Sequence, residues 1–71
     1  MTEQIRAELV GSVFDVVASV GDTVDEGDSL VIIESMKMEI PVIAESPGVV
    51  ASVDVAVGDV LQPGDLIATV S

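Results

Sequence analysis

Cysteine and histidine are both absent from the sequence, and Phe14 is its only aromatic residue. We expect one domain over residues 1–71, and a domain of this size buries only about 60% of its unfolded surface. Small domains are commonly stabilised by disulfides or a structural metal, and this composition lacks the usual residues for either. Stability must therefore come from apolar packing. Hydrophobic residues, mostly valine, leucine and isoleucine, make up 49% of the chain.

Basic residues are also scarce. Arg6 and Lys37 stand against 13 acidic residues, which gives a formal net charge of −11. This charge disfavours nucleic acid and acidic membrane surfaces as partners. No apolar run approaches membrane-spanning length, and the first residues lack the basic and apolar regions of a signal peptide. We therefore expect a cytoplasmic protein, monomeric on its own, that binds neither nucleic acid nor membrane; the lack of cysteine fits a reducing compartment.

The composition also argues against an enzyme. Without histidine or cysteine, abundant carboxylates alone do not define a general acid–base pair. The acidic segment 22–28, DTVDEGD, lacks the alternating spacing and the later glutamate of a calcium loop. We expect neither catalytic residues nor a metal site.

An internal repeat is visible when the sequence is aligned with itself at an offset of 37 residues. Segment 7–30, AELVGSVFDVVASVGDTVDEGDSL, lies over segment 44–67, AESPGVVASVDVAVGDVLQPGDLI, and each copy contains V-G-D-x-[VL]-x-x-G-D. Chance matching in a valine-rich chain would explain paired valines, but not the coinciding glycines and aspartates. The chain therefore consists of two related halves.

Each half is predicted to form short strands separated by turns. Valine and isoleucine favour an extended backbone, and no stretch sustains the apolar spacing of a helix. Gly-Asp and Pro-Gly pairs divide the chain, because glycine supplies positive φ and the adjacent aspartate can cap the turn through its carboxylate. The expected strands lie near residues 4–9, 12–17, 22–25, 29–34, 39–43, 49–54, 59–62 and 66–70. They predict an all-β fold, a flattened β-barrel or sandwich of two four-stranded antiparallel sheets with a pseudo-two-fold axis.

Lys37 lies in the link between the two copies. At the same offset its counterpart would be position 74, just beyond the last residue, where the two chain ends meet. A two-fold axis therefore predicts that Lys37 lies at the pole opposite the chain ends, where another protein can reach it.

The apolar runs on either side of Lys37 predict a β-hairpin whose two-residue turn is Met36-Lys37. The expected cross-strand pairs are Ser35 with Met38, Glu34 with Glu39, Ile33 with Ile40, and Leu30 with Ile43. Like charges opposite each other cost stability, and the tip lacks the Asn-Gly or other glycine-containing pair that a tight hairpin turn prefers. Such conflicts with local rules are expected at functional sites. At least one of the two methionines should be exposed.

The segment ESMKME (34–39) resembles the biotin-attachment motif of biotin carboxyl carrier domains, where the lysine of M-K-M accepts biotin in amide linkage. The resemblance covers essentially the whole chain, including both V-G-D segments and the P-G-x-V at 47–50. The thumb loop of some acetyl-CoA carboxylase carriers has no room between Val13 and Gly21. The residues that this resemblance singles out are Lys37 as the biotinylated residue, Met36 and Met38 as flanks read by the ligase, and Glu34 and Glu39 as candidates for ligase recognition.

The resemblance implies a carrier protein that is a substrate of biotin protein ligase. Its biotin would carry carboxylate between the biotin carboxylase and carboxyltransferase subunits of a biotin-dependent carboxylase, with acetyl-CoA, propionyl-CoA, pyruvate or urea as the acceptor. Two alternatives remain. One is a lipoylated carrier, although lipoyl domains place their lysine in a D-K-A or similar context. The other is an acidic β-sandwich that binds a partner without being modified.

Overall fold

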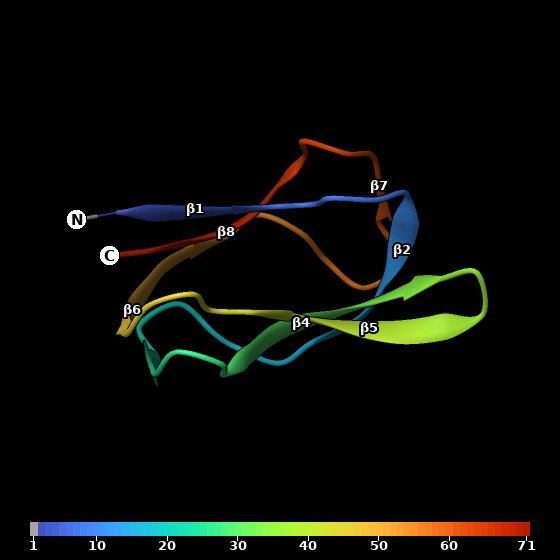
Figure 1. Cartoon of the computed structure of the whole chain (residues 1–71). Coiled ribbons are helices and arrows are strands. Elements are labelled where there is room, and N and C mark those ends of the chain that lie inside the picture. Colours follow the sequence, from blue (N-terminus) through green and yellow to red (C-terminus); the bar gives the residue numbers. More distant parts are fainter. Residues whose placement is uncertain (1) are drawn as a thin grey trace.

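A computed structural model describes residues 2–71, which form eight β-strands. The strands are β1 (Glu3–Arg6), β2 (Gly11–Val16), β3 (Thr23–Val24), β4 (Ser29–Ser35), β5 (Met38–Ile43), β6 (Gly48–Val53), β7 (Val60–Leu61) and β8 (Leu66–Val70). They pair into two antiparallel sheets, ordered β1-β8-β6-β3 and β5-β4-β2-β7, which make a flattened sandwich (Figure 1). The predicted all-β fold with two four-stranded sheets is confirmed. Within residues 2–71, no helix is long and apolar enough to cross a membrane.

Three strands are shorter than the sequence predicts. β1 ends at Arg6 rather than at residue 9, because its register with β8 shifts between Ile5 and Arg6 and the chain then leaves the sheet. β3 and β7 contain two residues each, since tight turns on both sides leave room for no more. All eight expected strands are therefore present, while these strand ends are wrong.

The backbone hydrogen bonds follow the two-fold repeat residue by residue. The Gly21 N–H donates to the Val50 carbonyl at 2.8 Å, and the Gly58 N–H donates to the Val13 carbonyl at 2.9 Å. Each residue of the second bond lies 37 positions from its equivalent in the first. Each sheet takes two strands from each half of the chain, so neither half forms a sheet by itself.

Four turns share one construction, which the sequence pattern predicted. Each has a glycine with φ between 91° and 97° at its third position, a conformation that residues with a Cβ rarely adopt. The aspartate that follows accepts a hydrogen bond through Oδ2 from the backbone N–H three residues earlier. The four turns end at Asp22, Asp28, Asp59 and Asp65. These carboxylates therefore serve the fold, as expected for turn caps.

The core between the sheets is built from symmetry-related apolar residues. Six pairs of buried side chains are separated by 37 positions: Ala7 and Ala44, Val13 and Val50, Val24 and Leu61, Leu30 and Ile67, Val31 and Ala68, Ile33 and Val70. No polar or charged side chain is buried among residues 2–71. The aliphatic composition thus yields one dry core that holds β4, and with it the start of the lysine hairpin.

Candidate modification site

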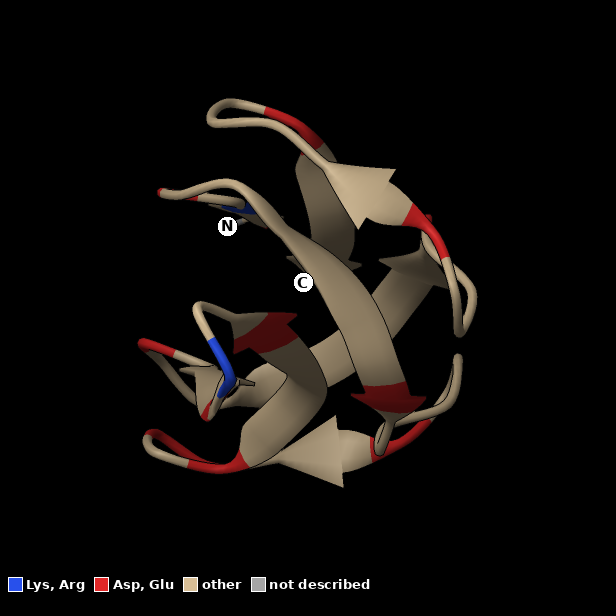
Figure 2. Cartoon of the chain, turned by 90° about the vertical axis from the view of Figure 1, so that its right-hand side faces the viewer, with Lys and Arg blue, Asp and Glu red and all other residues tan. Residues whose placement is uncertain are grey.

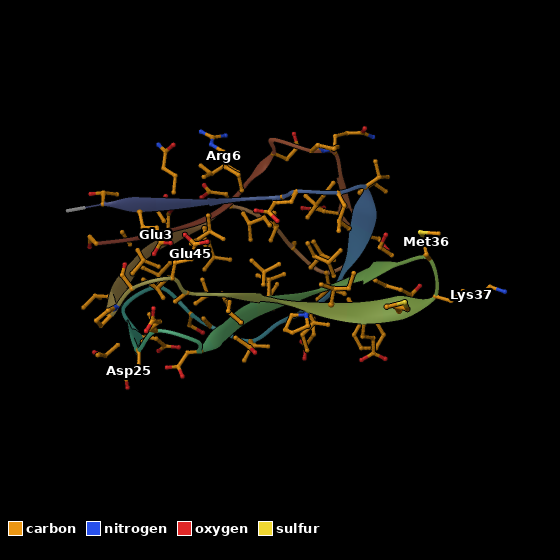
Figure 3. All side chains as sticks on the ribbon, viewed as in Figure 1. Glu3, Arg6, Asp25, Met36, Lys37 and Glu45 are labelled. Carbon is orange, nitrogen blue, oxygen red and sulfur yellow. The ribbon has the colours of Figure 1, made fainter. Side chains whose placement is uncertain are left out.

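Lys37 lies at the tip of the hairpin formed by β4 and β5. In Figure 1 this tip is at one end of the molecule, while the start of β1 and the C-terminus are at the other. The molecule measures 32 × 18 × 17 Å along its principal axes, so the tip and the chain ends are separated along the long axis. The predicted placement of Lys37 opposite the chain ends is confirmed. The lysine is exposed, and its side chain points away from the sandwich (Figure 3).

The hairpin has the predicted register near its tip. Ser35 lies opposite Met38, Glu34 opposite Glu39, and Ile33 opposite Ile40. The expected pair of Leu30 with Ile43 is wrong, because Ile43 lies opposite Ser29 and the register shifts between Ser29 and Val31. Leu30 and Val31 are both buried. A regular strand would turn one of two successive side chains outward, and a bulge allows both to reach the core.

The turn itself has an unfavourable backbone conformation. Met36 has φ of 53° and Lys37 has φ of 63°. A type I′ hairpin turn needs positive φ at both central residues, which Asn and Gly supply most easily. For other L-residues the left-handed conformation costs roughly 1–2 kcal/mol each. The identity of these two residues is therefore not explained by the stability of the turn.

Close to its tip, the hairpin is fastened to β2 and to the residue before β2. The Ser35 hydroxyl donates a hydrogen bond to the Val10 carbonyl at 2.7 Å. At Gly11, an added Cβ would lie 2.6 Å from Ile33 Cγ2 and 2.8 Å from the Glu34 carbonyl oxygen. A glycine is thus needed for this close approach. Neither Ser35 nor Gly11 is predicted as a site residue from the sequence, although the Gly11/Gly48 identity in the repeat was the available signal.

The predicted flanking residues surround Lys37 as exposed side chains. Met36 is 92% exposed and Met38 is 62% exposed. The sequence predicted that at least one of them would be exposed, and both are. Glu34 and Glu39 are exposed and lie directly opposite each other one residue further from the tip. The methionines do not fill the core. They and the two glutamates are available to a partner.

The surroundings of Lys37 are acidic and offer no second reactive group. Acidic positions are spread around the outline of the molecule, seen in Figure 2 from the right-hand side of Figure 1. Within residues 2–71, no three Asp or Glu side chains are grouped in a way that could hold a metal ion. A shallow hollow beside the tip is lined by apolar side chains that include Leu9, Val10 and Val60. The chemistry available at the tip is therefore that of one accessible primary amine.

Two comparisons with known proteins cover nearly the whole chain. The sequence profile of the family described as "Biotin-requiring enzyme" matches residues 3–70. The biotinylated protein TB7.3 homolog of Mycobacterium leprae is 59% identical over 71 residues, which is all of both chains. Both matches extend over residues 34–39 of this chain, and so over the tip of the hairpin.

Two solved structures extend the comparison. The urea carboxylase of Kluyveromyces lactis superposes with a TM-score of 0.95 at 38% identity, covering all of this chain and 6% of that one. The lipoyl domain of the 2-oxoglutarate dehydrogenase complex from Azotobacter vinelandii superposes with a TM-score of 0.76 at 25% identity, covering 94% of this chain and 95% of that domain. The urea carboxylase is thus similar to this chain in both sequence and fold, and the lipoyl domain mainly in fold.

Proposed function

The chain belongs to the biotin-requiring enzyme family, and we propose that it is a biotin carboxyl carrier whose biotin is joined to Lys37. The observation that carries this proposal is the placement of the chain's only lysine at an exposed hairpin tip between two exposed methionines. The 59% sequence identity to a protein named as biotinylated, over the whole chain, supports it. We further propose a cytoplasmic location and a monomer in the free state.

Acylation of Lys37 needs an external enzyme, the biotin protein ligase, with biotin and ATP as co-reactants. In the transfer step, Lys37 Nζ forms an amide bond with the carboxyl carbon of biotin, the bond from that carbon to AMP breaks, and Nζ releases a proton. Lysine amines are protonated at neutral pH because their ordinary pKa is about 10.4. The chain has no histidine or cysteine to take the proton, so the ligase or solvent must do so.

The exposed neighbours of Lys37 are suited to selective recognition. Met36 and Met38 present flexible apolar side chains on either side of the amine, and Glu34 and Glu39 add paired negative charge. We assign all four to ligase recognition. A single lysine also means that the ligase has no competing side-chain amine on this chain.

Bound biotin would supply the carboxylate-carrying group, and the domain would supply its mobility and presentation. The partners are then the biotin carboxylase and carboxyltransferase subunits of a biotin-dependent carboxylase. Tethering raises the effective concentration of the carried group at each active site. The structural similarity to the corresponding part of a urea carboxylase supports this class of partner.

A lipoylated carrier is the second candidate function. The superposition on a lipoyl domain favours it as far as the fold is concerned. The two methionines beside Lys37 argue against it, since lipoyl domains place their lysine in a D-K-A or similar context. An unmodified acidic interaction domain would not account for a lysine held at a strained tip.

The mass of the intact protein, purified from its native cell, tests these candidates. We expect the mass of the chain plus one biotinyl group and a streptavidin signal. Lys37→Arg is the matched control, because it keeps the positive charge but removes the acylated amine. This variant should lose the added mass and the streptavidin signal while its far-UV circular dichroism stays unchanged. A lipoyl mass, an unmodified mass, or biotin retained on Lys37→Arg would contradict the proposal.

A further inference from the structure

The internal two-fold gives the residues of one sheet, apart from Ser35 and Met38 beside the turn, a counterpart in the other sheet. The pairing of β2 with β4 and of β6 with β8 has the same register and the same bulge, displaced by 37 positions. The pairing of β4 with β5 repeats that of β8 with β1 in the same way. Both outer faces of the sandwich therefore present nearly the same backbone to solvent. Side-chain differences between the two faces are not demanded by the fold.

We define the lysine face as the outer surface of β2, β4 and β5 next to the hairpin tip. It carries three exposed carboxylates, from Glu34, Glu39 and Asp15. Across the sheet, Glu34 lies between Ser12 and Glu39. Asp15 lies opposite Ile32, which is two residues before Glu34 in β4. Their counterparts 37 positions away on the opposite face are Ser71, Thr2 and Ser52. Every carboxylate on the lysine face is thus replaced by a hydroxyl on the other.

The lysine face also carries apolar side chains where the opposite face has polar or smaller ones. Ile32 lies between Asp15 and Pro41 across the sheet, and Phe14 is 48% exposed at the bulge of β2. Ile32, Pro41 and Phe14 correspond to Thr69, Gln4 and Ala51 on the opposite face. Ser12 differs in the opposite sense, since its counterpart is Val49, which is 42% exposed. The lysine face is therefore both more acidic and more apolar than its structural equivalent.

The fold does not need these carboxylates. Four other aspartates cap turns through their side chains, whereas within residues 2–71 no side-chain hydrogen bond involves Asp15, Glu34 or Glu39. Placing Glu34 opposite Glu39 lowers stability through like-charge repulsion. A solubility role would not require that they share one face with half-buried Ile32 and exposed Phe14.

We propose that the lysine face is the docking surface for the ligase that acylates Lys37, extending past the tip to Asp15, Ile32, Phe14 and Pro41. The inference rests on the proposed function. The ligase surface that fits is apolar at its centre, to cover Ile32 and Phe14, and basic at its edge, to pair with the carboxylates. Charge complementarity of this kind speeds association and fixes orientation.

The ligase is the occupant that the geometry favours among enzymes acting on the tip. The unmodified amine stands on the four-carbon stem of a lysine, so an enzyme that reaches it must come against the hairpin and the sheet beside it. Enzymes that use the finished arm meet a group further from the domain. They have less need of contact with β2.

The test exchanges residues of the lysine face for their own counterparts. Asp15→Ser and Ile32→Thr place on this face the side chains that the same backbone carries at positions 52 and 69, so folding should be preserved. We expect each to raise the KM for the carrier by about fivefold with purified ligase, biotin and ATP. The effect of Asp15→Ser should shrink at high salt, as expected for a charge contact.

Asp25→Ser is the matched control for net charge, because Asp25 lies at the end of the molecule remote from Lys37 (Figure 3). It removes one negative charge without altering the lysine face and should change KM by less than about twofold. Unchanged KM values for both Asp15→Ser and Ile32→Thr would overturn the docking proposal while leaving acylation of Lys37 intact. Equal effects of Asp15→Ser and Asp25→Ser would also overturn it, in favour of net charge. If the unaltered protein accepts no biotin, the proposed function fails and the docking surface with it.

Discussion

At the Met36-Lys37 turn, both residues adopt positive φ without being glycine or asparagine. Their side chains gain nothing from the core in exchange, since Met36 is 92% exposed. Strain of this kind persists only where the surrounding structure enforces it and is concentrated at functional positions. Here the flanking strands and the Ser35 hydroxyl hold the turn. The strained residues are Lys37, which presents the amine, and Met36, whose side chain we assign to recognition by the ligase.

The first prediction separates the cost of this turn from its use. Met36→Gly removes a left-handed non-glycine residue, so we expect the free energy of unfolding to rise by up to about 1 kcal/mol. This corresponds to an increase in Tm of roughly 4–8 °C for a domain of this size. Biotinylation should nevertheless become slower, because the ligase loses an apolar contact. Thermal unfolding and initial biotinylation rates measure the two effects.

Met38→Leu is the companion variant, because residue 38 lies in β5 and carries no turn strain. A swap of similar volume at this exposed position should leave Tm nearly unchanged while slowing biotinylation. A fall in Tm for Met36→Gly would contradict the strain at the turn, and undiminished biotinylation of both variants would show that the methionines do not serve recognition.

At the scale of single elements, the β4–β5 hairpin depends on β2 for its position. Gly11→Ala places a Cβ against Ile33 and the Glu34 backbone, so the part of β4 next to the tip must shift. We expect a loss of about 1–3 kcal/mol in the free energy of unfolding together with slower biotinylation. Denaturant unfolding and the ligase assay provide the measurements.

The internal repeat supplies the control for this prediction. At Gly48→Ala the added Cβ meets Val70 and the Ser71 carbonyl, at the end of the molecule that carries the chain ends. Stability should fall there too, and biotinylation of the folded protein should be unchanged. If both variants impair biotinylation to the same extent, the effect comes from general destabilisation and not from the hairpin.

A further prediction concerns the length of the turn. Inserting two glycines between Met36 and Lys37 should relieve the backbone strain and keep the sandwich folded, but it should abolish biotinylation, because it displaces the amine from both methionines. The same insertion between Glu26 and Gly27, close to Asp25 at the remote end (Figure 3), should leave biotinylation intact. The streptavidin signal and far-UV circular dichroism of both variants test this. A biotinylated tip insertion would mean that the ligase does not read the turn.

Much of this architecture could be predicted from the sequence because the repeat and the turn residues act locally. The Gly-Asp pairs specify four turns through positive φ and carboxylate caps. The position of Lys37 between the two copies of the repeat predicts that it lies at the pole opposite the chain ends. The bulge at Leu30 could not be predicted, since it depends on how two adjacent side chains reach the core. The hydrogen bond from the Ser35 hydroxyl to the Val10 carbonyl joins residues 25 positions apart, and no local sequence pattern predicts it. Each sheet combines strands from both halves of the chain, and this pairing likewise depends on long-range contacts that the local sequence does not specify.

At the scale of the whole molecule, the fold separates two ends that have different tasks. The chain ends lie at one pole and the lysine tip at the other (Figure 1), so a polypeptide attached to Ser71 would not obstruct the tip. Fusing a bulky protein to Ser71 should therefore leave the rate of biotinylation nearly unaffected. This polarity follows from the two-fold axis. The repeat that builds the sandwich closes one hairpin at the tip and leaves the equivalent hairpin open at the chain ends.

A distance measurement tests this polarity directly. The chain has no native cysteine, so Lys37→Cys and Ser71→Cys allow two spin labels to be attached in one double variant. With a longest dimension of 32 Å, we expect a label-to-label separation of about 25–35 Å, somewhat more than the length of one strand. A second pair at Glu3→Cys and Ser71→Cys is the control and should give a much shorter distance, because Glu3 lies opposite Val70. A separation below about 15 Å for the first pair, less than the length of one strand, would contradict the two-fold arrangement and the accessibility of the tip that depends on it.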